Sequence, residues 1–348
     1  MVISLILCLS AGCGNTKSPS PITKKYFNTE LRHAIYESKE AVQISSKNLS
    51  KNNIDSYNDY LKDLMDKDYF CRVLLDNVVL EENGKDYQLK LSYKPNFFIP
   101  LYFSKNIEAA TKTLIEVFSN DPYCKVTMIF DCDNLSDEAI FSVLDSAEIN
   151  LSSCPFEADN VYFERYDKVD GKTIVNLWLG FSASRDEMDK RKNELELAIS
   201  SLAEEIKDLN LVSREEKYKA VFNLISSNVF YDHRLALETA IGNKSESTPL
   251  NRSSYGALVD GRSVCSGFAR GYKAICDKLE LPCLVVGSSK DGISHAFNVI
   301  ELNGKKYFVD PTAKAQGESD ENSFLLEEKD LDGLGYVLND YFIIPERL

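Results

Sequence analysis

The chain has 348 residues, of which 44% are hydrophobic and 27% are charged, and its formal net charge is −14. This length suits two ordinary domains or one large one, and the composition supplies enough apolar side chains for a globular core. Because an acidic protein repels phosphate backbones and anionic lipids, the charge argues against a nucleic-acid groove or an anionic membrane groove.

The first residues resemble the end of an export signal. Residues 1–9 are apolar apart from Ser4, and small residues precede Cys13. So short a stretch cannot span a bilayer, and this pattern is typical of a bacterial lipoprotein site in which the cysteine carries the lipid. No Lys or Arg precedes the apolar run, so a buried strand with an incidental cysteine stays an alternative. The sequence predicts a signal peptide over 1–13, lipidation at Cys13 and an extracytoplasmic protein held to the membrane only through that anchor.

The next part of the chain predicts a tether and then an α+β domain. Residues 14–24 contain two prolines and several small polar residues, which indicates a flexible tether. Residues 25–184 mix helical and strand-like periodicity and carry no chemical motif. Helices are expected over 29–44, 54–65, 106–118 and 136–147, and strands over 87–93, 125–130, 161–166 and 173–182. Asp170 and Gly171, between the last two strands, favour a hairpin.

A long polar helix is expected over residues 185–209, where Glu and Lys recur at helical spacing. We therefore predict a linker helix over 185–212 and a second domain over 213–348. That domain should begin with an amphipathic helix over 215–228, followed by a loop-rich stretch over 235–252.

The nine cysteines do not form a recognisable framework. No CxxC pair occurs and the chain has three histidines, so a zinc site is not expected. Export would permit disulfides, which leaves the state of the four cysteines in the N-terminal half open. These four are Cys71, Cys124, Cys132 and Cys154.

Cys265 differs from the other cysteines in its setting. Apolar residues recur at helical spacing from Phe268 to Leu279, so a helix should begin at or just after Cys265. Unpaired N–H groups and the positive end of the helix dipole stabilise a thiolate there, which makes a cysteine nucleophilic. Gly267 and Gly271 share one face of this helix and allow another element to approach closely. The plainer alternative is a buried cysteine at a helix start.

A hairpin brings a histidine and an aspartate together. Asn303-Gly304 joins two strand-like segments, 294–302 and 305–310, and is a strong signal for a two-residue turn. In the register that this turn sets, Asp310 is the same-face diagonal neighbour of His295, within reach of a hydrogen bond. A base oriented by a carboxylate is what nucleophilic catalysis needs.

Three blocks of sequence, in this order, resemble the transglutaminase-like superfamily, its bacterial members especially. They are residues 263–269 (SVCSGFA), 294–299 (SHAFNV) and 307–312 (YFVDPT). The resemblance implies an α+β fold whose papain-like core packs a nucleophile helix on an antiparallel sheet. It also implies Cys265 as nucleophile, His295 as base and Asp310 as the residue that orients the base.

The sequence departs from the family at supporting positions. Phe297 and Ala313 stand where tryptophan is common, which puts substrate preference in doubt more than the triad. The backbone N–H of Cys265 is one candidate donor of the oxyanion hole, and Tyr255 is a weak second.

The resemblance implies a cysteine-dependent enzyme that transfers acyl groups from amide bonds of protein or peptide substrates, cell-wall peptides among the candidates. Whether the acceptor is water, as in a peptidase or amidase, or a lysine amine, as in a transglutaminase, stays open, as does the oligomeric state. No cofactor, metal or nucleic-acid partner is expected. The alternatives are a catalytically inactive adhesion or scaffolding protein that keeps the fold, and a cytoplasmic enzyme.

Overall fold

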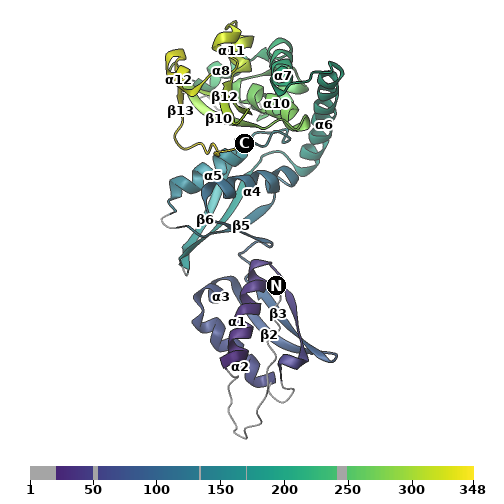
Figure 1. Cartoon of the computed structure of the whole chain (residues 1–348), viewed down its shortest axis with the longest axis vertical. Coiled ribbons are helices and arrows are strands. Elements are labelled where there is room, and N and C mark those ends of the chain that lie inside the picture. Colours follow the sequence, from purple (N-terminus) through teal and green to yellow (C-terminus); the bar gives the residue numbers. More distant parts are fainter. Residues whose placement is uncertain (1–20, 50–53, 133–134, 170, 241–248) are drawn as a thin grey trace. The chain divides into compact units, whose positions relative to one another are not determined.

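A computed structural model describes residues 21–49, 54–132, 135–169, 171–240 and 249–348. The predicted signal peptide, Cys13 and most of the tether lie outside these residues. The described chain contains both helices and mainly antiparallel sheets (Figure 1), so the predicted α+β class is confirmed. Among the described helices, none combines the length and the apolar character needed to cross a bilayer.

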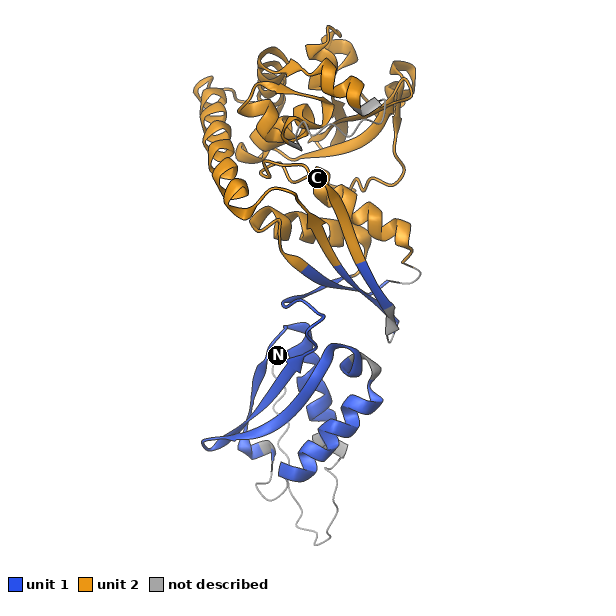
Figure 2. Cartoon of the chain, turned by 180° about the vertical axis from the view of Figure 1, so that it is seen from behind, with its two compact units in different colours: residues 1–104, 126–133, 164–176 blue, residues 105–125, 134–163, 177–348 orange. Residues whose placement is uncertain are grey.

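The chain forms two compact units, coloured separately in Figure 2. Unit 1 falls within residues 1–104, 126–133 and 164–176, and unit 2 comprises residues 105–125, 134–163 and 177–348. This division differs from the boundary predicted at 185–212, because helices from the N-terminal half join the C-terminal region in unit 2.

Unit 1 packs helices on an antiparallel sheet of order β1-β3-β2. The elements are α1 (Pro21–Tyr36), β1 (Ala41–Ile44), α2 (Ile54–Lys67), α3 (Tyr69–Leu74), β2 (Leu75–Asn83) and β3 (Asp86–Tyr93), with a short 3-10 turn at Ser46–Asn48. Phe27, Leu31, Leu61 and Leu89 are among its core residues.

Two predictions for this unit are wrong. The helix expected over 29–44 ends at Tyr36, and residues 41–44 form β1, which pairs with β3. Ser38 takes a positive φ of 51°, which breaks the helix, and pairing with β3 then overrides helical periodicity. Residues 21–24 of the predicted tether are helical instead, since proline suits the first turn of a helix.

A second sheet has the order β4-β5-β7-β6, with β4 (Leu101–Ser104) parallel to β5 (Lys125–Phe130). β6 (Asn160–Val169) and β7 (Lys172–Gly180) are neighbours, as the hairpin signal predicts. The boundary between the units passes through β5, β6 and β7.

Four longer helices of unit 2 begin where the sequence offers caps. α4 (Ile107–Asn120), α5 (Asp137–Ile149), α6 (Arg185–Asp208) and α7 (Arg214–Asn228) each follow an Asn or Ser whose side chain accepts a first-turn N–H. These bounds agree with the predicted helices within three residues. Of the stretch 235–252, expected to be loop-rich, residues 235–240 belong instead to α8 (His233–Ala240) and Pro249–Arg252 form a 3-10 turn, while residues 241–248 lie outside the described residues.

The C-terminal part of unit 2 is a helix packed on an antiparallel sheet of order β12-β11-β10-β13. The strands are β10 (Cys283–Lys290), β11 (Ile293–Leu302), β12 (Lys305–Val309) and β13 (Tyr336–Leu338), and the helix is α10 (Cys265–Lys278). Phe268, Tyr272 and Ile275 of α10 share a core with Ile300 and Val309 of the sheet. The expected helix-on-sheet core is therefore present.

Short elements complete this region. They are β8 (Phe230–Tyr231), α9 (Ser254–Leu258), β9 (Arg262–Ser263), α11 (Pro311–Ala315) and α12 (Glu328–Leu331), with 3-10 turns at Asp320–Asn322 and Asp332–Leu334. β8 and β9 form a parallel pair of two strands.

Candidate active site

Cys265 is the first residue of α10, as the sequence predicts. The preceding residue, Val264, is the N-cap and its side chain accepts no hydrogen bond from the first-turn N–H groups of the helix. These groups and the helix dipole favour negative charge at the sulfur and at an oxygen bound beside it. A Cβ added to Gly267 would lie 1.8 Å from the Ser263 hydroxyl and 2.7 Å from the Ser253 carbonyl oxygen. This glycine therefore permits the close approach that its position predicts.

His295 and Asp310 meet as the hairpin register predicts. Glu301 pairs with Lys306 and Asn298 with Val309, which confirms the register. His295 lies on β11, and Asp310 follows β12 and caps α11. The ring Nε2 of His295 lies 2.7 Å from Oδ2 of Asp310, whose side chain is fully buried. Because Asp310 takes Nε2, Nδ1 is the ring nitrogen left for a thiol.

The surroundings of the pair favour its charged form. Burial lowers the pKa of His295, but the charge and hydrogen bond of Asp310 and a hydrogen bond with Cys265 outweigh it and raise the pKa to about 10. Burial raises the pKa of Asp310, but His295, the Ala313 N–H and the Tyr336 hydroxyl lower it below the ordinary value. An imidazolium–carboxylate pair follows at neutral pH.

Cys265 and His295 line one cavity of about 350 Å³. Aromatic side chains form part of its wall, among them Tyr231, Tyr341 and Phe342. Phe342 packs against Gly287 of β10, where an added Cβ would lie 2.0 Å from the ring. Thus the three predicted site residues meet: Asp310 lies buried behind His295, while Cys265 and His295 face space that a substrate can enter.

Tyr336 is a site residue that the sequence does not reveal. Its hydroxyl donates a hydrogen bond of 2.7 Å to Oδ2 of Asp310, the oxygen that also faces His295. Lys290 donates to the same hydroxyl at 3.0 Å, across the pairing of β10 with β13. The ring of Tyr336 stacks on the ring of Phe297, with the two ring centroids 5.0 Å apart. No motif marks Tyr336, which belongs to a three-residue strand far from the three blocks.

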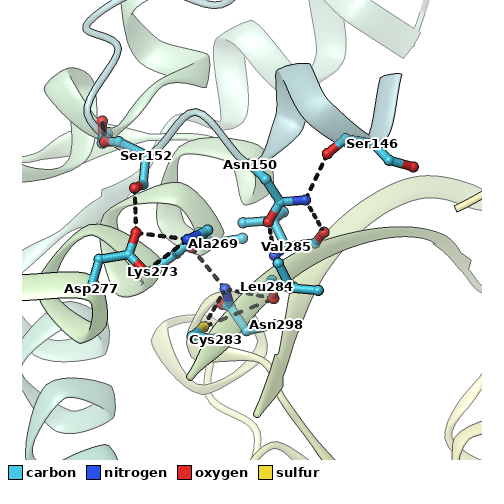
Figure 3. Close-up of polar contacts among 11 residues, drawn as sticks. Ser146, Asn150, Ser152, Ala269, Lys273, Asp277, Cys283, Leu284, Val285 and Asn298 are labelled. Atoms are coloured by element: carbon cyan, nitrogen blue, oxygen red, sulfur yellow. Dashed lines mark hydrogen bonds and ion pairs between the residues drawn. The ribbon is translucent and has the colours of Figure 1, made fainter. Parts of the chain in front are cut away.

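Buried amides fix α10 and α5 to the sheet, as Figure 3 shows. Asn298 of β11 donates to the Ala269 carbonyl oxygen of α10 at 2.9 Å, which ties the helix of Cys265 to the strand of His295. Asn150, which ends α5, donates to the Val285 carbonyl oxygen at 3.0 Å and accepts from its N–H at 2.8 Å. Asn298 thus supports the site without lining its cavity.

The positions that depart from the family have other roles here. Phe297 is buried between the rings of Phe308 and Tyr336 and packs beside His295. Ala313 is buried and donates its N–H to Asp310 at 3.0 Å. Tyr255, the weak candidate for the oxyanion hole, donates to Glu194 at 2.5 Å and is absent from the cavity wall. Its assignment as an oxyanion donor is therefore not supported.

The other described cysteines are free thiols. Burial raises the pKa of Cys71 to about 12 and that of Cys124 to about 11, so these thiols stay protonated at neutral pH. Within the described residues, no group of three or more His, Cys, Asp or Glu side chains is placed to hold a metal ion.

Comparison with known proteins finds similarity in structure alone. No family model and no curated protein matches the sequence. One similar structure, described as a TGase, has 15% identity and a TM-score of 0.35 over 74% of this chain and 69% of its own.

A proposed cysteine protease from Cytophaga hutchinsonii has 13% identity and a TM-score of 0.28, over 62% of this chain and 75% of its own. A proposed protease from Parabacteroides distasonis has 11% identity and a TM-score of 0.26, over 65% of this chain and 46% of its own. Likeness at this level leaves activity and substrate to be argued from the residues of this chain.

Proposed function

We propose that this protein is a cysteine-dependent acyl-transfer enzyme acting on amide bonds of proteins or peptides. The observation that carries the proposal is the constellation of Cys265, His295 and Asp310. A cysteine at a helix N-terminus and a histidine held at 2.7 Å by a buried carboxylate share one cavity. This arrangement supplies a nucleophile, a proton carrier and an orienting group, the three parts of a catalytic triad.

The chemistry follows from these positions. The Cys265 thiolate attacks the amide carbonyl, and first-turn N–H groups of α10 stabilise the oxyanion. The His295 imidazolium gives its proton to the leaving nitrogen, which departs as an amine and leaves a thioester on Cys265. Neutral His295 then takes a proton from water or from an acceptor amine as it attacks the thioester. The acid or the new amide is released, and the thiolate–imidazolium pair is restored.

Thiol labelling tests this proposal. In the wild type, iodoacetamide should modify Cys265 quickly already at pH 6, because the raised pKa of His295 favours an imidazolium, which would stabilise a thiolate beside it. In His295→Ala the rate at pH 6 should fall about 100-fold, since an ordinary thiol with a pKa of about 8.5 is largely protonated there. Mass spectrometry of labelled peptides measures both rates.

Cys124 and Cys132 provide the internal control, because they are partly exposed like Cys265 and no interaction with His295 is seen for either of them among the described residues. The rate at which iodoacetamide labels these two cysteines should rise with pH and should be the same in the wild type and in His295→Ala. If Cys265 labels no faster than these two, the enzyme proposal is wrong. The inactive scaffold would then be the better interpretation.

We further propose that the protein is exported and anchored by a lipid on Cys13. The support is the apolar run over residues 1–9 and the small residues before Cys13. In a bacterial host fed an alkyne fatty acid, the wild-type protein should carry the alkyne in the membrane fraction, and Cys13→Ser should not. Unlabelled wild-type protein in the cytoplasmic fraction would contradict the anchor and favour a cytoplasmic enzyme.

A further inference from the structure

The cavity that holds Cys265 and His295 also has a charged wall, formed by Glu157 and Arg252. Glu157 lies in the connection between α5 and β6, and Arg252 ends the 3-10 turn Pro249–Arg252. Neither residue belongs to the three sequence blocks. The proposed acyl transfer uses neither of them. Their position in the wall of the same cavity as Cys265 suits a role in substrate binding.

The two residues are the accessible half of a larger cluster of charges. Behind them, Arg270 of α10 donates to Glu148 of α5 at 2.6 Å, and these side chains are 1% and 12% exposed. Arg252 and Glu157 are 34% and 26% exposed. A molecule in the cavity therefore meets the front pair, whereas the rear pair is closed to it.

Glu157 has capacity for a further partner. Its contact with Arg252 is 3.3 Å, longer than the 2.7–2.9 Å that is usual for a charge-assisted bond. Among the described residues, Arg252 is the one hydrogen-bond partner of the Glu157 side chain. The carboxylate of Glu148, in contrast, accepts from Arg270 at 2.6 Å and from the Ala158 N–H at 2.9 Å.

The electrostatics also favour an additional cation. Burial raises the pKa of Glu157, and the charge of Glu148 adds to this effect, while Arg270 and Arg252 oppose it. The charged form of Glu157 is therefore less stable here than in water. A positive group entering the cavity would stabilise it, and the net charge of −14 would favour the approach of that group.

From this geometry we infer that Glu157 binds a cationic group of the substrate. The substrate class would be peptides that carry an ammonium or guanidinium group close to the amide attacked by Cys265. Glu157 is then a specificity-determining residue, and Arg252 holds its carboxylate in place. The inference rests on the proposed function, because it needs Cys265 to react with what the cavity binds.

Charge-matched thiol reagents test this without a known substrate. Trimethylammonioethyl, methyl and sulfonatoethyl methanethiosulfonates are cationic, neutral and anionic, and each forms a disulfide with a thiolate and releases methanesulfinate. The measurement is the rate at which each modifies Cys265, followed by mass spectrometry of the intact full-length protein. The ratio of cationic to neutral rates, divided by the same ratio for free cysteine, reports the cationic preference of the cavity.

In Glu157→Gln this ratio should fall about tenfold, and in Arg252→Gln it should rise, because one charge of the pair is removed in each case. The neutral rate should stay within about twofold of the wild type. Glu215→Gln is the matched control. It removes the same charge from an exposed position on α7 and should leave the ratio unchanged, which separates a local effect from the overall charge.

An unchanged ratio in Glu157→Gln, with Cys265 still quickly modified by the neutral reagent, would overturn the inference and leave the proposed function standing. Slow neutral modification of Cys265 in the wild type would contradict the proposed function itself. If Glu157→Gln disturbs folding and so lowers the rate with the neutral reagent, the Arg252→Gln variant serves as the test instead. A ratio that does not rise in that variant overturns the inference.

Discussion

Asp310→Asn should lower the rate at which p-nitrophenyl acetate acylates Cys265 by about 10²–10⁴-fold at pH 7, the range of a lost general acid–base group. The carboxylate accepts three hydrogen bonds, from His295, Tyr336 and the Ala313 N–H. An asparagine has one acceptor oxygen and one NH2 donor, so it cannot satisfy all three. If its oxygen keeps the Ala313 N–H, its NH2 faces Nε2 of His295.

That arrangement reverses the role of the imidazole. Nε2 becomes the acceptor, the proton moves to Nδ1, and Nδ1 is the nitrogen left for Cys265. The ring can then no longer take a proton from the thiol, a loss that substitution at the orienting carboxylate causes in other triads. Loss of the negative charge also removes the main influence that holds the pKa of His295 above its ordinary value.

Tyr336→Phe is the matched control for this prediction. It removes one of the three donors and keeps the ring packed on Phe297, so acylation should fall by less than in Asp310→Asn. The burst of p-nitrophenolate and the mass of the acetyl-enzyme measure the rates. Equal acylation in wild type and Asp310→Asn would show that the carboxylate does not orient a base, and the triad would have to be abandoned.

The parts of the site that the sequence predicts are those set by local chemistry. The Asn303-Gly304 turn fixes the register of β11 on β12, and period-two alternation then places Asp310 beside His295. The apolar stripe after Cys265 sets the start of α10. Each of these signals lies close in the sequence to the feature that it specifies. The feature can therefore be predicted without knowledge of the fold.

What the sequence does not reveal depends on contacts between distant segments. Tyr336 reaches Asp310 because β13 pairs with β10, and nothing near Tyr336 in the sequence indicates that partner. The helix expected over 29–44 gives way to β1 because β3 offers it a neighbouring strand. In both cases long-range pairing decides the outcome, and local periodicity carries no information about it.

The observed division into units differs from the predicted boundary for the same reason. α4 and α5 precede the predicted boundary by many residues, yet they belong to unit 2. Buried polar groups on α5 and after it, Glu148 and Asn150, find partners on α10 and β10. In the sequence, Glu148 is one acidic residue among many, and its burial becomes visible only with Arg270 in place.

Glu148→Gln should destabilise unit 2 by about 3–5 kcal/mol, the cost of leaving a buried charge without its partner. Arg270 is 1% exposed and donates to Glu148 at 2.6 Å. A glutamine of the same shape keeps one acceptor oxygen but removes the charge that compensates the guanidinium. Because Trp178 is the single tryptophan and lies in unit 2, its fluorescence during urea unfolding measures the free energy of this unit.

Two further variants test whether the loss of stability comes from the unpaired Arg270. The double variant Glu148→Gln/Arg270→Met removes the orphaned charge as well, so it should recover much of the lost stability. Glu196→Gln breaks the exposed ion pair of 2.6 Å between Glu196 of α6 and Lys278 of α10, and should cost no more than about 1 kcal/mol. A loss in Glu148→Gln no larger than that of Glu196→Gln would mean that the pair is well hydrated and does not hold α5 to α10. Since α5 leads directly into the segment that carries Glu157, the charged wall of the cavity depends on this contact.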